Sequence, residues 1–474
     1  MFTKCRILPI LLVALFVFSS IGVAYESSNK PFFVSSNTYD LVIIAPKIFS
    51  RALSPLVKHK NDVGVKTILK TTEDIYREYN GRDKPEQIKY FIKDALETWG
   101  IKYVLLVGGL KSGRQSWYVP VRYSNLDDRQ GWDLRYISDL YYADIYKYEN
   151  DEKVFDDWDS NGNGIFAEWN WNSSVKDVLD LTPDVCVGRL ACRDLFEVRT
   201  VVQKIINYET GTSSSNWFKN MVIAGGDTFP SDDNYFEGEI ITNLSSSYMK
   251  SIGFNITHLW ASDGTLENSN DLIMALRIGA GFVHLSGHGS ALVWSTHPPH
   301  NDTLWIDSLF TYQARSIRNG EKLPIFVIGG CHNNQFDVSP FNILRDIRRE
   351  GLGYFKSDEY EPGSFWKLEW IPECLGWRLI SARNGGAIAT IANTGMGFAY
   401  PGNYTLNGLD GWLEPRFFYD YSVGGKDILG ELYGQAITDY VSNFNVHNDR
   451  SDCKTVQQWI LLGDPSLKIG GYPN

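Results

Sequence analysis

Short apolar runs that end abruptly in glycine constrain this chain more than any other feature of its sequence. One lies in LPIFVIGGCHNNQFD, Leu323 to Asp337, where the apolar residues stop at Gly329-Gly330 and Cys331 follows. Such a run predicts a buried strand whose end presents one side chain at the edge of a sheet. A second run, GFVHLSGHGS, ends in the same way with His288 between two glycines. The sequence therefore predicts that two buried strands bring a thiol and an imidazole to one sheet edge.

Strands alternate with helices along most of the chain. The stretches Tyr39 to Pro46, Lys102 to Gly109 and Pro183 to Leu190 have the composition of buried strands, and Pro85 to Gly100 has helical spacing. This alternation predicts an α/β fold with a mainly parallel sheet covered by helices. GTSSSN, Gly211 to Asn216, has the composition of a linker, so we expect two adjacent α/β subdomains.

The predicted organisation has three parts. Residues 1–24 form a signal peptide, residues 25–211 an N-terminal α/β subdomain, and residues 212–474 a C-terminal subdomain with both candidate catalytic strands. An acidic, aromatic and glycine-rich segment of about residues 145–180 is predicted as an insertion in the first subdomain.

The first residues have the pattern of an export signal. Lys4 and Arg6 precede an apolar run over residues 7–18, and Gly22-Val23-Ala24 supplies the small residues that a signal peptidase requires. No later stretch approaches the roughly 18 apolar residues that span a bilayer. We therefore expect a secreted protein without a membrane anchor. A net charge of −11 argues against a general nucleic-acid binder.

A cysteine and a histidine at one sheet edge favour nucleophilic catalysis. A neighbouring imidazole can take the thiol proton and activate the sulfur for attack on a carbonyl. Glycines beside both residues allow backbone amides to approach the substrate, so the N–H groups of Gly289 and Cys331 are predicted to form an oxyanion hole. Five cysteines follow the predicted leader, and this odd number leaves at least one free thiol.

Two other interpretations of these residues stay open. Cys331 and His288 can each be ordinary structural residues, since most buried thiols are inert. They can also belong to a zinc site, because His284 and His288 share one strand face and Cys331-His332 could complete four ligands. The glycines beside His288 and Cys331 suit the approach of a substrate better than a closed metal cage.

A third strand, MVIAGGD, ends in a carboxylate. A thiol–imidazole pair works better when a carboxylate orients the ring and stabilises its charged form. Asp227 is the natural candidate, because one more parallel strand would deliver it to the same edge. The alternative is that Asp227 caps a loop or the following helix.

These motifs resemble those of the gingipain family of secreted cysteine peptidases. The resemblance runs from about Tyr39 to Leu467 and is carried by SGHGS, VIGGC and LLGDPSL, with support from KYVLLVGG and PDVCVGRLACR. It implies a caspase-like fold, in which Cys331 is the nucleophile and His288 the general base. The segment GGDTFPS then places Asp227 at the third catalytic position of that family.

The same resemblance implies a preference for basic residues before the cleaved bond. Gly238 aligns with the acidic residue at the base of the substrate pocket in arginine-specific gingipains, and Glu237 and Glu239 flank it. Phe398 aligns with the pocket wall and could stack on a guanidinium. We expect one of the two glutamates to pair with the substrate cation.

The segment DWDSNGNGIFAE fits the spacing of an EF-hand calcium loop. Oxygen-bearing side chains stand at alternate positions, Gly162 permits the sharp turn, and a glutamate closes the loop. A hydrated turn without metal is the alternative. The predicted Ca²⁺ ligands are Asp157, Asp159, Asn161, Asn163 and Glu168.

Together these features predict a secreted cysteine endopeptidase that acts on protein or peptide substrates through a thioester and carries a structural Ca²⁺. The alternative is a catalytically silent secreted module that keeps the caspase-like fold to bind a protein or a glycan. The complete set of Cys331, His288 and Asp227 favours the enzyme. The sequence leaves the natural substrate, the disulfide pairing and the oligomeric state open.

Overall fold

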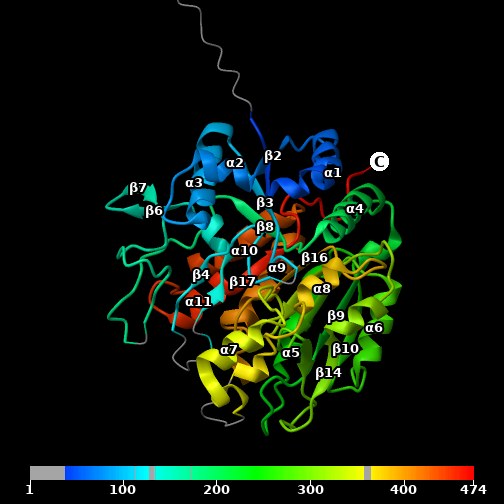
Figure 1. The fold of residues 1–474 in the computed structure, drawn as a ribbon. Coiled ribbons are helices and arrows are strands. Elements are labelled where there is room, and N and C mark those ends of the chain that lie inside the picture. Colours follow the sequence, from blue (N-terminus) through cyan, green and yellow to red (C-terminus); the bar gives the residue numbers. More distant parts are fainter. Residues whose placement is uncertain are drawn as a thin grey trace, which may run out of the picture. The chain divides into compact units, whose positions relative to one another are not determined.

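One ten-stranded sheet forms the core of the protein (Figure 1). The computed structural model describes residues 38–112, 114–127, 133, 135–170, 172–356 and 364–473. The predicted signal peptide lies outside these ranges. From one edge to the other, the strand order is β10-β9-β11-β15-β16-β17-β8-β3-β1-β2. In chain order these strands are β1 (Leu41–Ala45), β2 (Thr67–Thr71), β3 (Tyr103–Val107), β8 (Cys186–Leu190), β9 (Asn220–Gly225), β10 (Asn255–Trp260), β11 (Phe282–Ser286), β15 (Ile325–Gly329), β16 (Ala389–Asn393) and β17 (Trp459–Leu462).

The sheet consists of two parallel arrays that run in opposite directions. β1, β2, β3, β8 and β17 run one way, and β9, β10, β11, β15 and β16 run the other way. The arrays meet where β16 and β17 pair antiparallel. The mainly parallel α/β architecture expected from the sequence is therefore present. Because the two arrays run in opposite directions, the carboxyl ends of their strands lie at opposite sides of the sheet.

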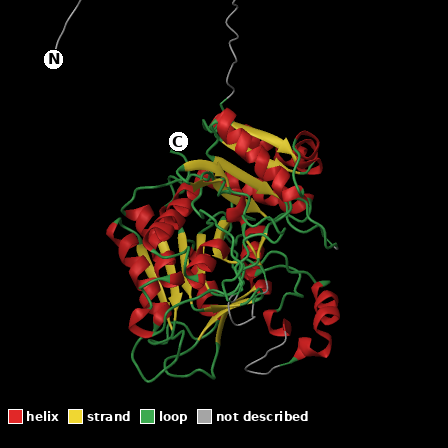
Figure 2. Cartoon of the chain, turned by 90° about the vertical axis from the view of Figure 1, so that its left-hand side faces the viewer, coloured by secondary structure: helices red, strands yellow, loops and turns green. Residues whose placement is uncertain are grey.

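Helices pack around the strands (Figures 1 and 2). β1, β3, β11, β15 and β16 are buried at every position, so both faces of the sheet are covered. The α-helices are α1 (Ser50–Asp62), α2 (Thr72–Glu78), α3 (Lys84–Trp99), α4 (Leu195–Gly211), α5 (Glu237–Ser251), α6 (Ser269–Ile278), α7 (Asn342–Glu350), α8 (Leu375–Ser381), α9 (Leu409–Ser422), α10 (Leu429–Asn443) and α11 (Arg450–Gln458). In one group α4 packs on α1 and α8, and in another α9 packs on α5 and α10.

Local sequence signals place several helix ends. The Asp194 side chain accepts hydrogen bonds from the backbone N–H groups of Phe196 and Glu197, and so caps α4 as its position predicts. Gly100 ends α3 with a φ of 68°, a left-handed conformation that glycine adopts at little cost. The sequence also predicts a helix from Cys374 to Asn384, but in the structure α8 begins at Leu375 and ends at Ser381.

Shorter strands extend the carboxyl end of the second array. β12 (His288–Gly289), β13 (Val293–Thr296) and β14 (Ile306–Phe310) form a three-stranded sheet directly after β11. Two small hairpin sheets, β4 (Tyr123–Ser124) with β5 (Tyr136–Ile137) and β6 (Tyr146–Glu149) with β7 (Glu152–Phe155), lie in the region between β3 and β8.

A buried ion cluster joins α1, α4 and the segment after β17. The Lys60 ammonium lies 2.7 Å from Glu209 and 2.8 Å from Asp464, and all three side chains are almost fully buried. Burial disfavours the charged form of Lys60, but the two carboxylates outweigh it and raise its pKa. The LLGDPSL motif therefore supplies a carboxylate that neutralises a buried lysine from the first helix.

The predicted boundary near residue 212 falls just after α4. The two proposed subdomains share the continuous sheet, and the division itself stays a prediction. Among the helices that the structure describes, none is long and apolar enough to cross a membrane.

Candidate active site

The register of β11 and β15 brings Cys331 and His288 to the same end of the sheet. The two strands are parallel neighbours in which Ser286 is paired with Gly329. His288 lies two residues beyond Ser286, and Cys331 lies two residues beyond Gly329. Both residues are half-buried. Adjacent parallel strands thus end level with each other, and the segments that carry the imidazole and the thiol lie side by side.

Two glycines let the backbones of these strand ends touch. A Cβ at Gly330 would lie 3.0 Å from the Gly289 nitrogen, and a Cβ at Gly289 would lie 2.6 Å from the Cys331 carbonyl oxygen. Contacts this short leave no room for a side chain at either position. Glycine at both positions therefore allows the two segments to approach, and the Gly289 amide lies against the Gly330-Cys331 backbone. The amides of Gly289 and Cys331 stay the predicted oxyanion donors.

The Asn333 side chain links the segment after Cys331 to the segment after Gly289. Its side-chain amide donates hydrogen bonds to the carbonyl oxygens of Ser290, at 2.8 Å, and Val293, at 3.1 Å. The loop after Cys331 is thereby tied to the loop after Gly289. Nothing in the sequence distinguished this asparagine from other loop residues.

The Cys331 thiol is protonated in the resting site. Burial raises the pKa of Cys331 to about 12, and the backbone of Gly397 opposes this shift only in part. The thiol lies 4.0 Å from the Gly397 carbonyl oxygen, to which it can donate a hydrogen bond. A thiolate at this site would lose hydration and be repelled by the carboxylates of Asp133 and Asp410, which the Lys454 ammonium offsets only in part. Cys331 therefore needs a base at the moment of attack.

The His288 ring is oriented by a backbone carbonyl. Its Nε2 lies 2.7 Å from the Thr228 carbonyl oxygen, which can only accept a hydrogen bond, so Nε2 carries the proton and Nδ1 is the basic nitrogen. Burial lowers the pKa of His288, and the Thr228 carbonyl partly opposes this effect. A neutral imidazole with a free Nδ1 lone pair can accept the thiol proton.

Aromatic rings surround the imidazole. Phe229 lies edge-on at 6.1 Å between ring centroids, Trp305 at 5.1 Å and His297 at 5.4 Å. The side chain of Trp305 is half exposed, whereas His297 is buried. These rings restrict the tilt of the His288 ring and reduce the access of water to it.

Asp227 lies one residue before the carbonyl that orients His288. Its carboxylate accepts a hydrogen bond of 2.9 Å from the His300 amide, and its backbone pairs with His297. In the part of the chain that the structure describes, no hydrogen bond joins Asp227 to His288. The carboxylate therefore holds the loop around residues 297–300 beside the ring, and a direct catalytic role for it stays a prediction.

The four residues of the alternative zinc site have separate partners. His284 is fully buried, and its Nε2 lies 3.0 Å from a Glu414 carboxylate oxygen. His332 is buried beside Asp133, at 3.8 Å. Within the described ranges, no group of three or more histidine, cysteine or acidic side chains converges in a way that could hold a metal ion.

Glu237 is engaged by backbone amides. One carboxylate oxygen accepts hydrogen bonds from the Thr228 and Phe229 amides, at 3.0 and 3.2 Å, and the other accepts from the Gly402 amide at 2.7 Å. The side chain is 1% exposed. Glu237 therefore anchors the segment that carries the ring-orienting carbonyl, and its pairing with a substrate cation stays a prediction.

Glu239 and Phe398 also have partners within the chain. Both carboxylate oxygens of Glu239 accept hydrogen bonds from Ser262, one from its amide at 2.9 Å and one from its hydroxyl at 2.6 Å. The ring of Phe398 faces the ammonium of Lys454 at 5.0 Å. Lys454 is in turn 2.9 Å from Asp133. These positions are occupied by internal contacts, and their part in substrate binding stays a prediction.

The predicted calcium loop has the turn geometry that its sequence indicates, and an arginine supplies its positive charge. Gly162 has a φ of 71°, and Asp159 accepts hydrogen bonds from the amides of Asn163 and Gly164. The Arg82 guanidinium lies 2.9 Å from Asp157 and 2.6 Å from Asp159. The side-chain amide of Asn163 donates a 2.6 Å hydrogen bond to Glu168, and the Asn161 side chain accepts from the Asn163 amide. The types of oxygen donor in this loop suit a hard cation, but among the described residues the carboxylates do not converge as metal ligands would, and Arg82 supplies the positive charge.

Comparison with known proteins places this arrangement in a family. The model of peptidase family C25 matches residues 34–470. Among curated relatives, gingipain R2 of Porphyromonas gingivalis strain W83 is 22% identical over 325 residues, which make up 68% of this chain and 36% of the relative. Gingipain R1 of the same species is 22% identical over 301 residues, 62% of this chain and 24% of the relative. The matched region thus spans about a third of these relatives or less.

Solved structures share the fold. The crystal structure of the Arg-specific cysteine proteinase gingipain R matches with a TM-score of 0.60 at 18% identity, over 92% of this chain and 78% of that chain. A complex of the pro- and mature domains of Porphyromonas gingivalis RgpB matches with a TM-score of 0.58 at 17% identity, over 91% and 79% of the two chains. The expected caspase-like α/β fold is confirmed, and this chain belongs to peptidase family C25.

Proposed function

We propose that the protein is a cysteine endopeptidase that hydrolyses peptide bonds through a thioester. The observation that carries this proposal is the register of β11 and β15, which sets His288 and Cys331 level at one sheet end. Membership of peptidase family C25 supports it. Protein or peptide chains are the proposed substrates, and export by the N-terminal segment is the proposed route to them.

In the proposed acylation, the Cys331 sulfur attacks the scissile carbonyl carbon while Nδ1 of His288 takes the thiol proton. The carbonyl oxygen becomes an oxyanion that the amides of Gly289 and Cys331 stabilise. The imidazolium then gives its proton to the leaving amine as the C–N bond breaks. The Thr228 carbonyl, which accepts from Nε2, stabilises the imidazolium between these two steps.

Deacylation repeats the same steps with water. His288 takes a proton from the water molecule as its oxygen attacks the thioester carbon. Collapse of the second tetrahedral intermediate breaks the C–S bond and returns the proton to the Cys331 sulfur. The products are the resting neutral thiol and imidazole and a peptide carboxylic acid, which gives its proton to the solvent.

The alternative function is a catalytically silent module that binds a protein or a glycan. A binding module has no need for a basic nitrogen of defined tautomer beside a thiol. The orientation of His288 by Thr228 therefore favours the enzyme.

We further propose cleavage after basic residues. The arginine specificity named for gingipain R supports this, although the two glutamates beside Gly238 are held by internal donors. Asp233 lies on an exposed loop that begins at Phe229, which contacts the His288 ring. A Cβ at Gly402 would lie 3.6 Å from Asp233 Oδ2, so this carboxylate lies beside the segment after Phe398. Asp233 is our candidate partner for the substrate cation.

We propose that the loop over residues 157–168 binds Ca²⁺ and that the ion displaces the Arg82 guanidinium from the loop carboxylates. The ion would supply the positive charge that now comes from the guanidinium. Asp157, Asp159, Asn161, Asn163 and Glu168 would hold it. Such a site would be structural, because the loop follows β7 in the first half of the chain, far in sequence from Cys331.

Removal of either catalytic side chain should abolish peptide hydrolysis. We expect Cys331→Ala to reduce kcat/KM to background and His288→Ala to reduce it by about 10²–10⁴-fold, because proton transfer by a positioned base contributes this much. Cys186→Ala, which removes another half-buried thiol, should keep full activity. Melting curves would verify that each variant is folded. Undiminished turnover in Cys331→Ala or His288→Ala would refute the mechanism, and a wild-type protein without hydrolysis or labelling by a thiol-directed peptide would favour the silent module.

The resting thiol should stay protonated well above neutral pH. Burial raises the pKa of Cys331 to about 12, so the neutral form dominates at every pH below that value. The difference in ultraviolet thiolate absorbance between wild type and Cys331→Ala should therefore be close to zero from pH 5 to about pH 9. A full thiolate signal in this range would show a resting thiolate–imidazolium pair and contradict the prediction.

Asp233 should control the preference for basic residues. We expect Asp233→Asn to reduce kcat/KM for arginine and lysine peptides by about five- to tenfold, as the loss of one charged pair implies, while peptides with alanine at that position change little. Glu239→Gln tests one of the two partners that the resemblance implies, and Asp62→Asn, which removes the same charge from an exposed carboxylate on α1, is the matched control. A peptide library that favours apolar or acidic residues would overturn the proposed specificity.

Ca²⁺ should raise the melting temperature of the protein. A ligand at a hundredfold excess over its Kd stabilises the native state by about 2.7 kcal/mol. Asp157→Ala or Glu168→Ala should remove the gain, whereas Arg82→Gln should increase it by removing the competing cation. Asp62→Ala, which removes an exposed carboxylate from α1, is the control. A melting curve that is indifferent to Ca²⁺ in both wild type and Arg82→Gln would rule the site out.

A further inference from the structure

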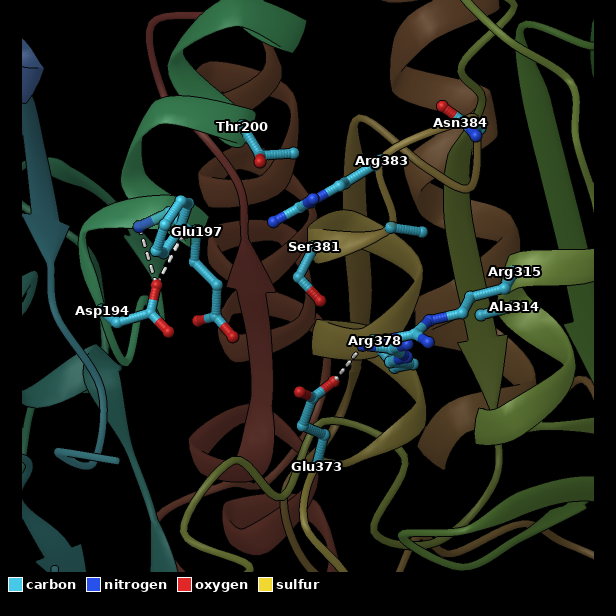
Figure 3. A pocket seen from close by; sticks show the side chains of 12 residues that line it. Asp194, Glu197, Thr200, Ala314, Arg315, Glu373, Arg378, Ser381, Arg383 and Asn384 are labelled. Carbon is cyan, nitrogen blue, oxygen red and sulfur yellow. Dashed lines mark hydrogen bonds and ion pairs between the residues drawn. The ribbon is translucent and has the colours of Figure 1, made fainter. Parts of the chain in front are cut away.

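A polar pocket of about 540 Å³ lies between α4, α8 and the short 3₁₀ helix η4 (Thr311–Ser316). Figure 3 shows its lining side chains, which include three acids and three arginines. The Arg383 side chain extends from the loop after α8 across the pocket toward α4, and Arg315 extends from η4 toward Arg378. The lining includes none of the residues placed around Cys331 and His288, so the pocket is separate from the proposed active site.

The acidic side chains of this pocket already have partners. Asp194 accepts hydrogen bonds from two amides at the start of α4. Glu197 accepts from Arg193 and from the indole N–H of Trp377. Glu373 is paired with Arg193 and, at 3.0 Å, with Arg378. These carboxylates act as structural acceptors, and a cation entering the pocket would have to displace their partners.

By contrast, two of the three arginines and one serine lack hydrogen-bond partners among the residues that the structure describes. Within the described ranges, neither Arg315 nor Arg383 forms a hydrogen bond or an ion pair, and Arg383 only lies over the Phe196 ring at 5.8 Å. The Ser381 side chain is 9% exposed, and its buried hydroxyl has no hydrogen-bond partner. A buried hydroxyl without a partner costs free energy unless a ligand satisfies it.

A buried lysine holds the segment that carries these donors. The Lys204 ammonium donates to the carbonyl oxygens of Ile380, at 2.7 Å, Ala382, at 3.2 Å, and Gly385, at 3.0 Å. Ser381 and Arg383 therefore project from a backbone that is fixed before any ligand arrives. Preorganised donors lower the entropic cost of binding.

We propose that this pocket binds an oxyanion of the phosphate or sulfate class. Two free guanidinium groups supply the charge and the forked N–H geometry that such oxygens accept, and the Ser381 hydroxyl supplies a further donor. A tetrahedral oxyanion offers enough acceptor oxygens for several donors that converge from different elements. A cation would find only carboxylates that already have partners.

Calorimetric titration of the intact protein with inorganic phosphate and with sulfate tests this proposal. Each titration is carried out at constant ionic strength with sodium chloride as balancing salt. We expect binding of both ions to wild type. The double variant Arg315→Gln/Arg383→Gln should weaken it at least about tenfold, because each charge-assisted hydrogen bond contributes substantially. Ser381→Ala should weaken binding by a smaller factor.

Arg348→Gln is the matched control, since it removes one exposed arginine charge from α7 and should keep wild-type affinity. Arg315 and Arg383 are both exposed, so the double variant should fold. If the double variant does not fold, the affinity of Arg383→Gln alone tests the proposal. A further titration with glucose 6-phosphate separates two sources of the ligand. Binding as tight as that of phosphate would identify phosphate esters as ligands, and failure to bind would identify the free ion.

The proposal is wrong if wild type binds neither ion at millimolar concentration, or if the double variant binds as well as wild type. Equal weakening by Arg348→Gln would likewise refute it, because the effect would then reflect net charge rather than the pocket. Loss of affinity confined to the pocket variants supports the site.

Discussion

The parallel pairing of β11 with β15 is the constraint on which the proposed active site depends. Backbone hydrogen bonds set Ser286 opposite Gly329, and each catalytic candidate follows two residues later. A slip of one residue would turn every side chain of the strand to the other face of the sheet. The buried apolar residues on both faces oppose such a slip, so the packing of the core also determines the separation of thiol and imidazole.

Buried polar groups also hold β11 and β15 in place. The Glu414 carboxylate on α9 fills the space where a side chain at Gly329 would stand, since a Cβ there would lie 2.2 Å from its oxygen. It also pairs with His284 on β11. Burial raises the pKa of Glu414 to about 8 and lowers that of His284 to about 3, so the imidazole is neutral. The same desolvation keeps Cys331 and His288 uncharged at rest, and charge in this region would develop only during catalysis.

The reversal of direction between β16 and β17 divides the sheet into two parts with different roles. The second array carries the proposed catalytic residues, whereas β1, β2, β3 and β8 extend the core. The Lys60 cluster connects α1 and α4 of the first half to the segment after β17. Removal of one partner from a buried ion group lowers the free energy of unfolding by about 3–5 kcal/mol. The Lys60 cluster therefore contributes substantially to the stability of the whole sheet.

The sequence by itself determined the buried strands, the α/β class and the places of Cys331 and His288 at strand ends, because apolar runs ended by glycine are local signals. The caspase-like class was implied by the family resemblance of motifs such as SGHGS and VIGGC. Only the tertiary structure decided which groups surround the ring. The Thr228 carbonyl that orients His288 is a backbone atom, so no residue type encodes it. Ser262, His300 and Gly402, which bind Glu239, Asp227 and Glu237, come from loops distant in sequence. Arg82 reaches the acidic loop from the segment just before α3. Spacing predicts which side chains a loop carries, but long-range packing decides which of them already have a partner.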